Sequence, residues 1–200
     1  MATFIIGIDP GSTSTGLTIM NSENNNLTLA RIQMTRCTIK EINTTKMTQA
    51  IVTTLNNSID SSLANEVYLC IEQMYFSPNF SKAFTSLNEL CGAIKYGVES
   101  NFKVTRIERV TSTSARAQLG IIAKRKEHKE ASIAYVKSKL ANYNVIPLNA
   151  ELPDLKRVVL RGKRYKLRIS NILQQDIADS FLFAIIMRNI YEECNSGIKI

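Results

Sequence analysis

The sequence predicts an α/β fold in which a mixed sheet of five strands is covered by helices on both faces. Three short apolar runs come first with only turns between them, which indicates an antiparallel meander. Two later runs are separated by a segment of helical periodicity, and parallel neighbours in a sheet need such helical connections. With 200 residues, 44% of them hydrophobic, the chain has the length and composition of one domain over residues 1–200.

We expect the five strands at residues 3–8, 17–20, 27–34, 67–71 and 102–107. A turn of Gly, Ser and Thr residues separates the first two strands, and an Asn-rich turn precedes the third. The fourth run is apolar throughout and is bounded by Glu66 and Glu72. It therefore predicts a strand that is buried on both faces at the centre of the sheet.

The positions of apolar residues predict helices at 45–63, 81–98, 132–143 and 172–193. The apolar side of the second helix packs either within the monomer or against a partner. Residues 147–169 are rich in charge and contain two prolines and a glycine. We expect this segment to form an insertion or a hairpin on the surface.

Basic residues are concentrated in the second half of the chain. Residues 1–100 carry 6 Lys and Arg against 8 Asp and Glu, whereas residues 101–200 carry 19 against 9. Most of the excess lies in two runs, 124–129 and 156–168. Clustered Lys and Arg are typical of proteins that bind a phosphate backbone, and a solvated charged face is the alternative.

The sequence also predicts the environment of the protein. The longest mostly apolar stretch, 177–187, is too short for a membrane span, and the first strand lacks the basic segment of a signal peptide. We therefore expect a cytoplasmic protein without membrane association. The four cysteines, of which we expect Cys70 and Cys91 to be core residues, form no C-x-x-C pair, so neither a zinc site nor a disulfide framework is expected.

Two acidic residues directly follow predicted buried strands. Asp9 comes after the first strand and Glu72 after the fourth, so both are expected at the rim of the sheet. Asp9 in Asp-Pro-Gly is also compatible with an ordinary Asx turn, and Glu72 with a surface residue at a strand exit.

Two further acids, Asp176 and Asp179, are three residues apart on the last helix and form one acidic edge. The helix dipole favours anions in the first turns, which explains one of these acids better than both. If the fold gathers all four carboxylates, they can coexist around divalent cations or with raised pKa values. An all-oxygen ligand set favours Mg²⁺ or Mn²⁺ over zinc, as in two-metal phosphodiester hydrolysis.

Three motifs resemble those of RuvC-type Holliday junction resolvases of the RNase H superfamily. They are Gly7-Ile8-Asp9-Pro10-Gly11-Ser12, Ile71-Glu72-Gln73 and Asp176-x-Ala178-Asp179-Ser180. Their order and spacing match over nearly the whole chain, and the length and the basic tract resemble the poxvirus branch of the family. The resemblance implies an RNase H-like fold and, for a viral protein, the host-cell cytoplasm.

The same resemblance implies a homodimeric, Mg²⁺-dependent endonuclease that places paired symmetric nicks across four-way DNA junctions. It would use two Mg²⁺ ions per active site, with Mn²⁺ as a substitute, branched DNA as its partner and no small-molecule cofactor. By motif match, the metal ligands and catalytic acids would be Asp9, Glu72, Asp176 and Asp179.

Residues for DNA binding follow less directly from the resemblance. The bacterial relatives use lysines before the last helices, where Lys124, Lys126 and Lys129 stand here, and we favour Lys129 ahead of Lys124 as the catalytic lysine. Tyr75 stands where these relatives carry an aromatic residue and would stack on bases or pack in the core. Further phosphate contacts are expected from Arg125, Arg161, Lys163, Arg164 and Lys166, and His128 is expected to be solvated.

Two other functions remain open from the sequence alone. An actin-like nucleotide-binding ATPase also begins with a strand followed by Asp-x-Gly, although 200 residues allow only one of its two lobes. A non-catalytic nucleic-acid-binding protein would use the basic half but leaves the four acids unexplained.

Overall fold

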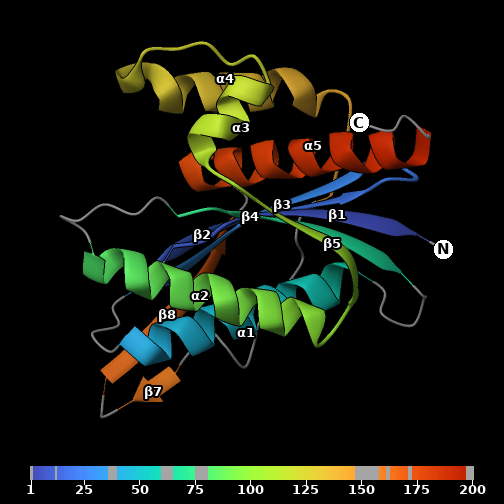
Figure 1. The fold of residues 1–200 in the computed structure, drawn as a ribbon. Coiled ribbons are helices and arrows are strands. Elements are labelled where there is room, and N and C mark those ends of the chain that lie inside the picture. The colour runs from blue at the N-terminus through green and yellow to red at the C-terminus, as the bar shows by residue number, and fades with distance from the viewer. Residues whose placement is uncertain are drawn as a thin grey trace.

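The protein is a single sheet with helices on both faces (Figure 1). The computed structural model describes residues 2–11, 13–35, 40–59, 65–74, 81–146, 158–160, 163–170 and 173–196. Helices α1 (Lys40–Ser58) and α2 (Ser81–Glu99) cover one face, and α5 (Gln175–Ser196) covers the other. Helices α3 (Ser112–Gln118) and α4 (His128–Leu140) pack on the outer side of α5.

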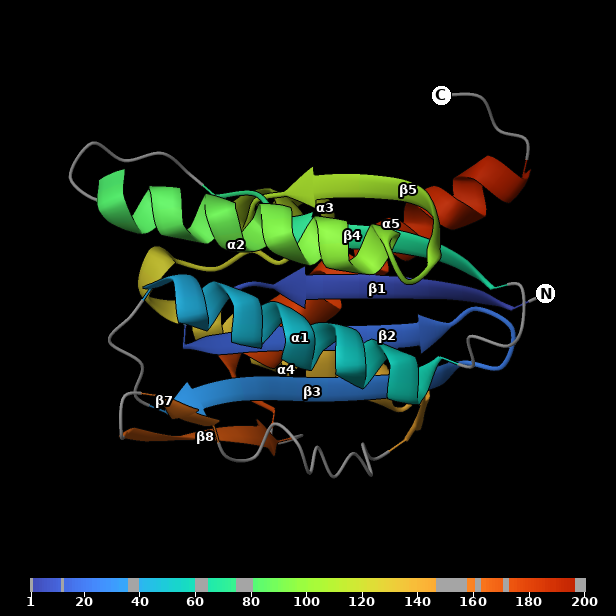
Figure 2. The same cartoon turned by 90° about the horizontal axis from the view of Figure 1, so that it is seen from below.

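Five strands form the mixed sheet that the sequence predicts. They are β1 (Thr3–Asp9), β2 (Ser14–Asn21), β3 (Asn26–Thr35), β4 (Glu66–Glu72) and β5 (Lys103–Val110). Their spatial order is β5-β4-β1-β2-β3, with an antiparallel meander of β1, β2 and β3 and with β4 and β5 parallel to β1 (Figure 2). The predicted fold class is therefore confirmed.

The sheet is larger than the sequence predicts, because the described residues form eight strands. Strand β8 (Lys163–Ser170) pairs antiparallel with β3, and β7 (Val158–Leu160) pairs with β8. A two-residue strand, β6 (Asn144–Val145), pairs with the start of β3. The charged segment thus contains the expected hairpin, which extends the sheet beyond β3. Basic residues at alternate positions of β8 hide its strand pattern.

The helices differ from the predicted ones mainly at their ends. The first helix begins earlier than expected, and the last begins and ends three residues later. Helix α3 is absent from the prediction, because its seven residues are too few for an apolar period to be recognised. Within the described residues, no helix has both the length and the hydrophobicity needed to cross a membrane.

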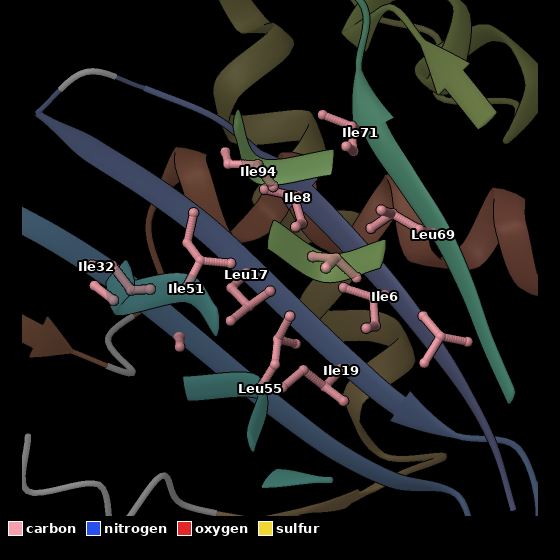
Figure 3. Packing of buried hydrophobic residues seen from close by; sticks show 14 of the residues in the cluster. Ile6, Ile8, Leu17, Ile19, Ile32, Ile51, Leu55, Leu69, Ile71 and Ile94 are labelled. Carbon is pink, nitrogen blue, oxygen red and sulfur yellow. The ribbon is translucent and has the colours of Figure 1, made fainter. Parts of the chain in front are cut away.

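Two hydrophobic clusters fill the layers on either side of the sheet. Alternate residues such as Ile6 and Ile8 face α1 and α2 (Figure 3), whereas Ile5 packs against α5. Leu90 and Ile94 of α2 are buried in the first cluster, so this side of the helix packs within the monomer.

The described cysteines behave as the sequence predicts. Cys70 and Cys91 are buried, and burial is the main cause that raises their thiol pKa values to about 12 and about 11. Both thiols therefore stay protonated and unreactive at neutral pH. Cys194 is exposed near the end of α5, and Cys37 lies outside the described residues.

Candidate active site

Two of the four predicted acids meet at one edge of the sheet. Asp9 is the last residue of β1 and Glu72 is the last residue of β4. The strands are parallel neighbours with Ile8 opposite Ile71, so both acids leave the sheet at the same point. The Asp9 carboxyl shares a hydrogen bond with Glu72.

The other two acids reach this edge because α5 lies unusually close to the sheet. Glycines at positions 7 and 16 permit the approach: a Cβ atom on Gly7 would collide with the carbonyl oxygen of Ser180, and one on Gly16 with that of Asp176. The hydroxyls of Thr18 and Ser180 are 2.9 Å apart across the same contact. The first turns of α5 are thereby held over the ends of β1 and β2.

The other three acids lie close enough to Asp9 to act on its charge. Burial raises the pKa of Asp9 well above its usual value, and the nearby carboxylates of Glu72, Asp179 and Asp176 raise it further. The protonated form of Asp9 is therefore favoured in this environment.

Asp176 is neutralised by a strand residue. Arg31 of β3 donates from Nε to Oδ2 of Asp176 at 2.9 Å, and the Ser14 hydroxyl donates to the same oxygen. Burial alone would raise the pKa of Asp176, but these two hydrogen bonds and the arginine charge outweigh it and lower that pKa. Both bonds reach one oxygen, so Arg31 and Ser14 fix this carboxylate through Oδ2.

Asp179 is held through both of its oxygens. Arg116 of α3 donates from Nη1 to Oδ1 at 3.3 Å, and Gln175 donates from Nε2 to Oδ2 at 2.5 Å. Burial raises the pKa of Asp179, and the bonds from Gln175 and Arg116 only partly oppose this effect. Within the described part of the chain, Nε of Arg116 and Oε1 of Gln175 are buried without a hydrogen-bond partner.

Helix α3 supplies a second contact to the site. The hydroxyl of Ser112, its first residue, donates to Oε1 of Glu72, while Arg116 on the next turn reaches Asp179. This short helix therefore joins the sheet edge to α5. Arg31, Ser14, Ser112 and Arg116 were not predicted as site residues, because no sequence motif marks them and their partners are remote in the chain.

The donor set fits hard divalent cations, although its orientation does not yet present a complete metal site. In the described residues, no three acidic, His or Cys side chains are arranged to hold an ion. Two of the carboxylates are bound by arginines, and Asp9 is hydrogen-bonded to Glu72. Carboxylate oxygens and the unpartnered Gln175 oxygen are the ligands that Mg²⁺ prefers.

The predicted basic residues at 124–129 are distant from the acids in sequence, and they follow helix α3, which contacts the acids. Lys124, Arg125, Lys126 and Lys129 are exposed in and around the 3₁₀ turn Arg125–Glu127 and the start of α4. His128 is partly buried rather than solvated, and its Nε2 lies 3.0 Å from the carbonyl oxygen of Ala123. The backbone of β8 carries Lys163, Arg164 and Lys166, whereas Tyr75 and Arg161 lie outside the described residues.

Comparison with solved structures identifies the class of fold. Thermus thermophilus RuvC has a TM-score of 0.56 at 16% identity, covering 98% of this chain and 97% of that chain. T. thermophilus RuvC in complex with a Holliday junction substrate has a TM-score of 0.55 at 12% identity, covering 97% of each chain. The yeast mitochondrial Holliday junction resolvase Ydc2 has a TM-score of 0.49 at 14% identity, covering 96% and 82%. The chain thus has the RNase H-like fold of RuvC proteins.

A family model then gives the narrower assignment. The model described as "Crossover junction endodeoxyribonuclease RuvC" matches residues 5–140, which is more than half of the chain. The chain belongs to this family. No relative was found among curated proteins.

Proposed function

We propose that this protein is a structure-selective endodeoxyribonuclease that resolves four-way and other branched DNA junctions by paired symmetric nicks. The observation that carries the proposal is the meeting of four carboxylates, from β1, β4 and α5, at one edge of an RNase H-like sheet. Membership of the RuvC family supports the endonuclease over the actin-like ATPase and the non-catalytic binder.

The proposed metal ligands are Asp9, Glu72, Asp176 and Asp179, holding two divalent ions, Mg²⁺ or, as a substitute, Mn²⁺. These residues would hold the ions where they would supply a lower pKa for the attacking water and stabilisation of the leaving 3′ oxygen. Hydrogen bonds within the chain would hold these ligands in place. Ser112 orients Glu72. Ser14 and Arg31 orient Asp176 through Oδ2, which leaves Oδ1 available to bind a metal ion.

Arg116 and Gln175 each bond to one oxygen of Asp179 and would orient this aspartate as a ligand. The Arg116 guanidinium lies at the site, and its unpartnered Nε could donate to the phosphate that is cleaved. Lys129, followed by Lys124, remains our candidate for a catalytic lysine, since both are exposed and belong to the segment that continues from α3.

We assign contacts with DNA phosphates to the exposed Lys and Arg side chains at 124–129 and to the basic strand β8. A homodimer with two-fold symmetry would place two such sites on the crossing strands of a junction, which accounts for paired nicks. We propose that the chain acts as one domain without a small-molecule cofactor, in the cytoplasm of a host cell if the poxvirus resemblance holds.

An immobile four-way junction provides the test. We expect the wild-type protein to nick two opposing strands at symmetric positions with Mg²⁺ and none with EDTA, as mapped on all four labelled strands. Asp9→Asn should bind the junction with similar affinity and lose at least about 10³-fold in cleavage rate, because a ligand of the catalytic ions is removed.

Lys95→Gln on α2 serves as the control, because it removes an exposed charge away from the acidic edge and should cleave normally. Metal-dependent nicking by purified Asp9→Asn at the wild-type rate would refute the proposed function.

A further inference from the structure

The structure exposes one isoleucine almost completely. Ile122, in the loop between α3 and α4, is 97% exposed, the highest value among the large hydrophobic residues described as exposed. Its neighbour Ile121 is instead partly buried and packs against the cluster beneath α5. A single exposed apolar residue is common, but near-complete exposure in a loop that follows a helix of the acidic site needs a physical account.

The loop holds Ile122 outward by fixed contacts on both sides. Before it, Gly120 adopts a positive φ of 68°, and the Ile121 N–H donates to the Arg116 carbonyl at 2.9 Å. After it, the Ala123 carbonyl lies 3.0 Å from Nε2 of His128. The side chain is therefore presented by an anchored backbone, so little conformational entropy is lost when a partner covers it.

The anchors of this loop lead directly to the acidic site. Arg116, whose carbonyl binds the loop, also pairs through its guanidinium with Asp179. Three exposed basic residues, Lys124, Arg125 and Lys126, follow shortly after Ile122 in the sequence. An apolar tip flanked by positive charge suits a nucleic acid better than a protein surface. The DNA phosphates can pair with the Lys and Arg side chains, while the apolar tip contacts the stacked nucleobases.

We propose that Ile122 is a wedge that inserts into the base stack next to the branch point of the bound junction. This inference rests on the proposed function and assigns a recognition role to a residue outside the acidic site. Inserting an aliphatic side chain unstacks a base step at a cost of a few kcal/mol in linear duplex. Stacking is already interrupted where strands exchange, so the wedge favours a junction over a duplex.

A fluorescent base analogue tests the wedge directly. A four-way junction carries 2-aminopurine beside the branch point, and Ca²⁺ replaces Mg²⁺ so that binding is followed without cleavage. We expect a fluorescence increase on binding wild-type protein, and Ile122→Ala should lose most of that increase and about tenfold in junction affinity. Ile122→Leu should restore both, and the salt dependence should be unchanged because no charge is altered.

Ile146→Ala is the matched control. Ile146 is 43% exposed and bonds through its backbone to Leu27 at the start of β3, so this variant should show the wild-type fluorescence increase. Equal fluorescence and affinity for Ile122→Ala and wild type, with normal nicking, would overturn the wedge while the proposed function stands. A lost dimer in sedimentation of Ile122→Ala would instead assign the residue to a protein interface and also overturn it. Failure of wild-type protein to bind or nick any junction would reject the proposed function itself.

Discussion

At the scale of single residues, two arginines determine the charge of the acidic site. Arg31 pairs with Asp176, and Arg116 pairs with Asp179, and all four side chains are at most 24% exposed. Four carboxylates meeting without cations would repel each other strongly. The arginines therefore act as internal counter-ions for two of these carboxylates.

Arg31→Gln tests this role, because it keeps a hydrogen-bond donor and removes the charge. We expect the free energy of unfolding in EDTA to fall by about 1–3 kcal/mol, between the values for exposed and buried ion pairs. Saturating Mn²⁺ should reduce this deficit, since a bound cation supplies the missing charge. Urea unfolding with and without Mn²⁺ measures both effects.

Lys95→Gln, which removes an exposed pair with Glu99, should cost less than about 0.5 kcal/mol and should not respond to Mn²⁺. If the deficit of Arg31→Gln is equally large with saturating Mn²⁺, then Arg31 contributes to packing and not to the charge balance of the site.

At the scale of elements, the distance between α5 and the sheet decides whether its acids reach the strand ends. Gly7 and Gly16 lie where the helix backbone contacts β1 and β2. Their requirement is steric, because any Cβ atom would strike backbone atoms of α5, which cannot rotate away as a side chain does.

Gly16→Ala should therefore destabilise the protein by about 2–3 kcal/mol and displace the first turn of α5. Junction cleavage should fall as well, because Asp176 moves with that turn. Gly92→Ala on α2 is the control: its added Cβ meets nothing within 4 Å, and replacing a helical glycine should raise stability by about 0.5–1 kcal/mol. Thermal unfolding compares the two, and equal stability of both variants would contradict the steric explanation.

Local sequence predicts some elements and conceals others. The five main strands and the helices on both faces follow from apolar periodicity, which burial imposes directly on the sequence. Helix α3 is too short to show a period, and basic residues at alternate positions conceal the strand pattern of β8. The missed elements include the one that supplies Ser112 and Arg116 to the site.

At the scale of the whole molecule, charge is divided between a weakly acidic first half and a strongly basic second half. Two of the site acids precede the basic runs in the chain and two follow them. Helix α3, which precedes the first basic run, contacts the acids through Ser112 and Arg116. The bound phosphates would compensate the positive surface while the cations compensate the acids. Binding should consequently be strongly dependent on salt.

The combined replacement of Lys124, Arg125 and Lys126 by Gln should flatten this salt dependence. The slope of log affinity against log salt should fall by about 0.9 for every phosphate that the protein no longer neutralises. Fluorescence anisotropy with a labelled junction at several salt concentrations gives the slope. Replacement of Lys137 and Lys139, exposed near the other end of α4, should change it less; equal effects would indicate nonspecific attraction by net charge.

The sequence by itself determined the fold class, the core strands and the four acids, because burial periodicity and the acids at strand ends are properties of neighbouring residues. Only the tertiary structure decided how these acids are balanced: Arg31 and Arg116 stand 145 and 63 positions away from their aspartates. Such pairs depend on the spacing of β3, α3 and α5 in three dimensions. No local pattern in the chain encodes that spacing.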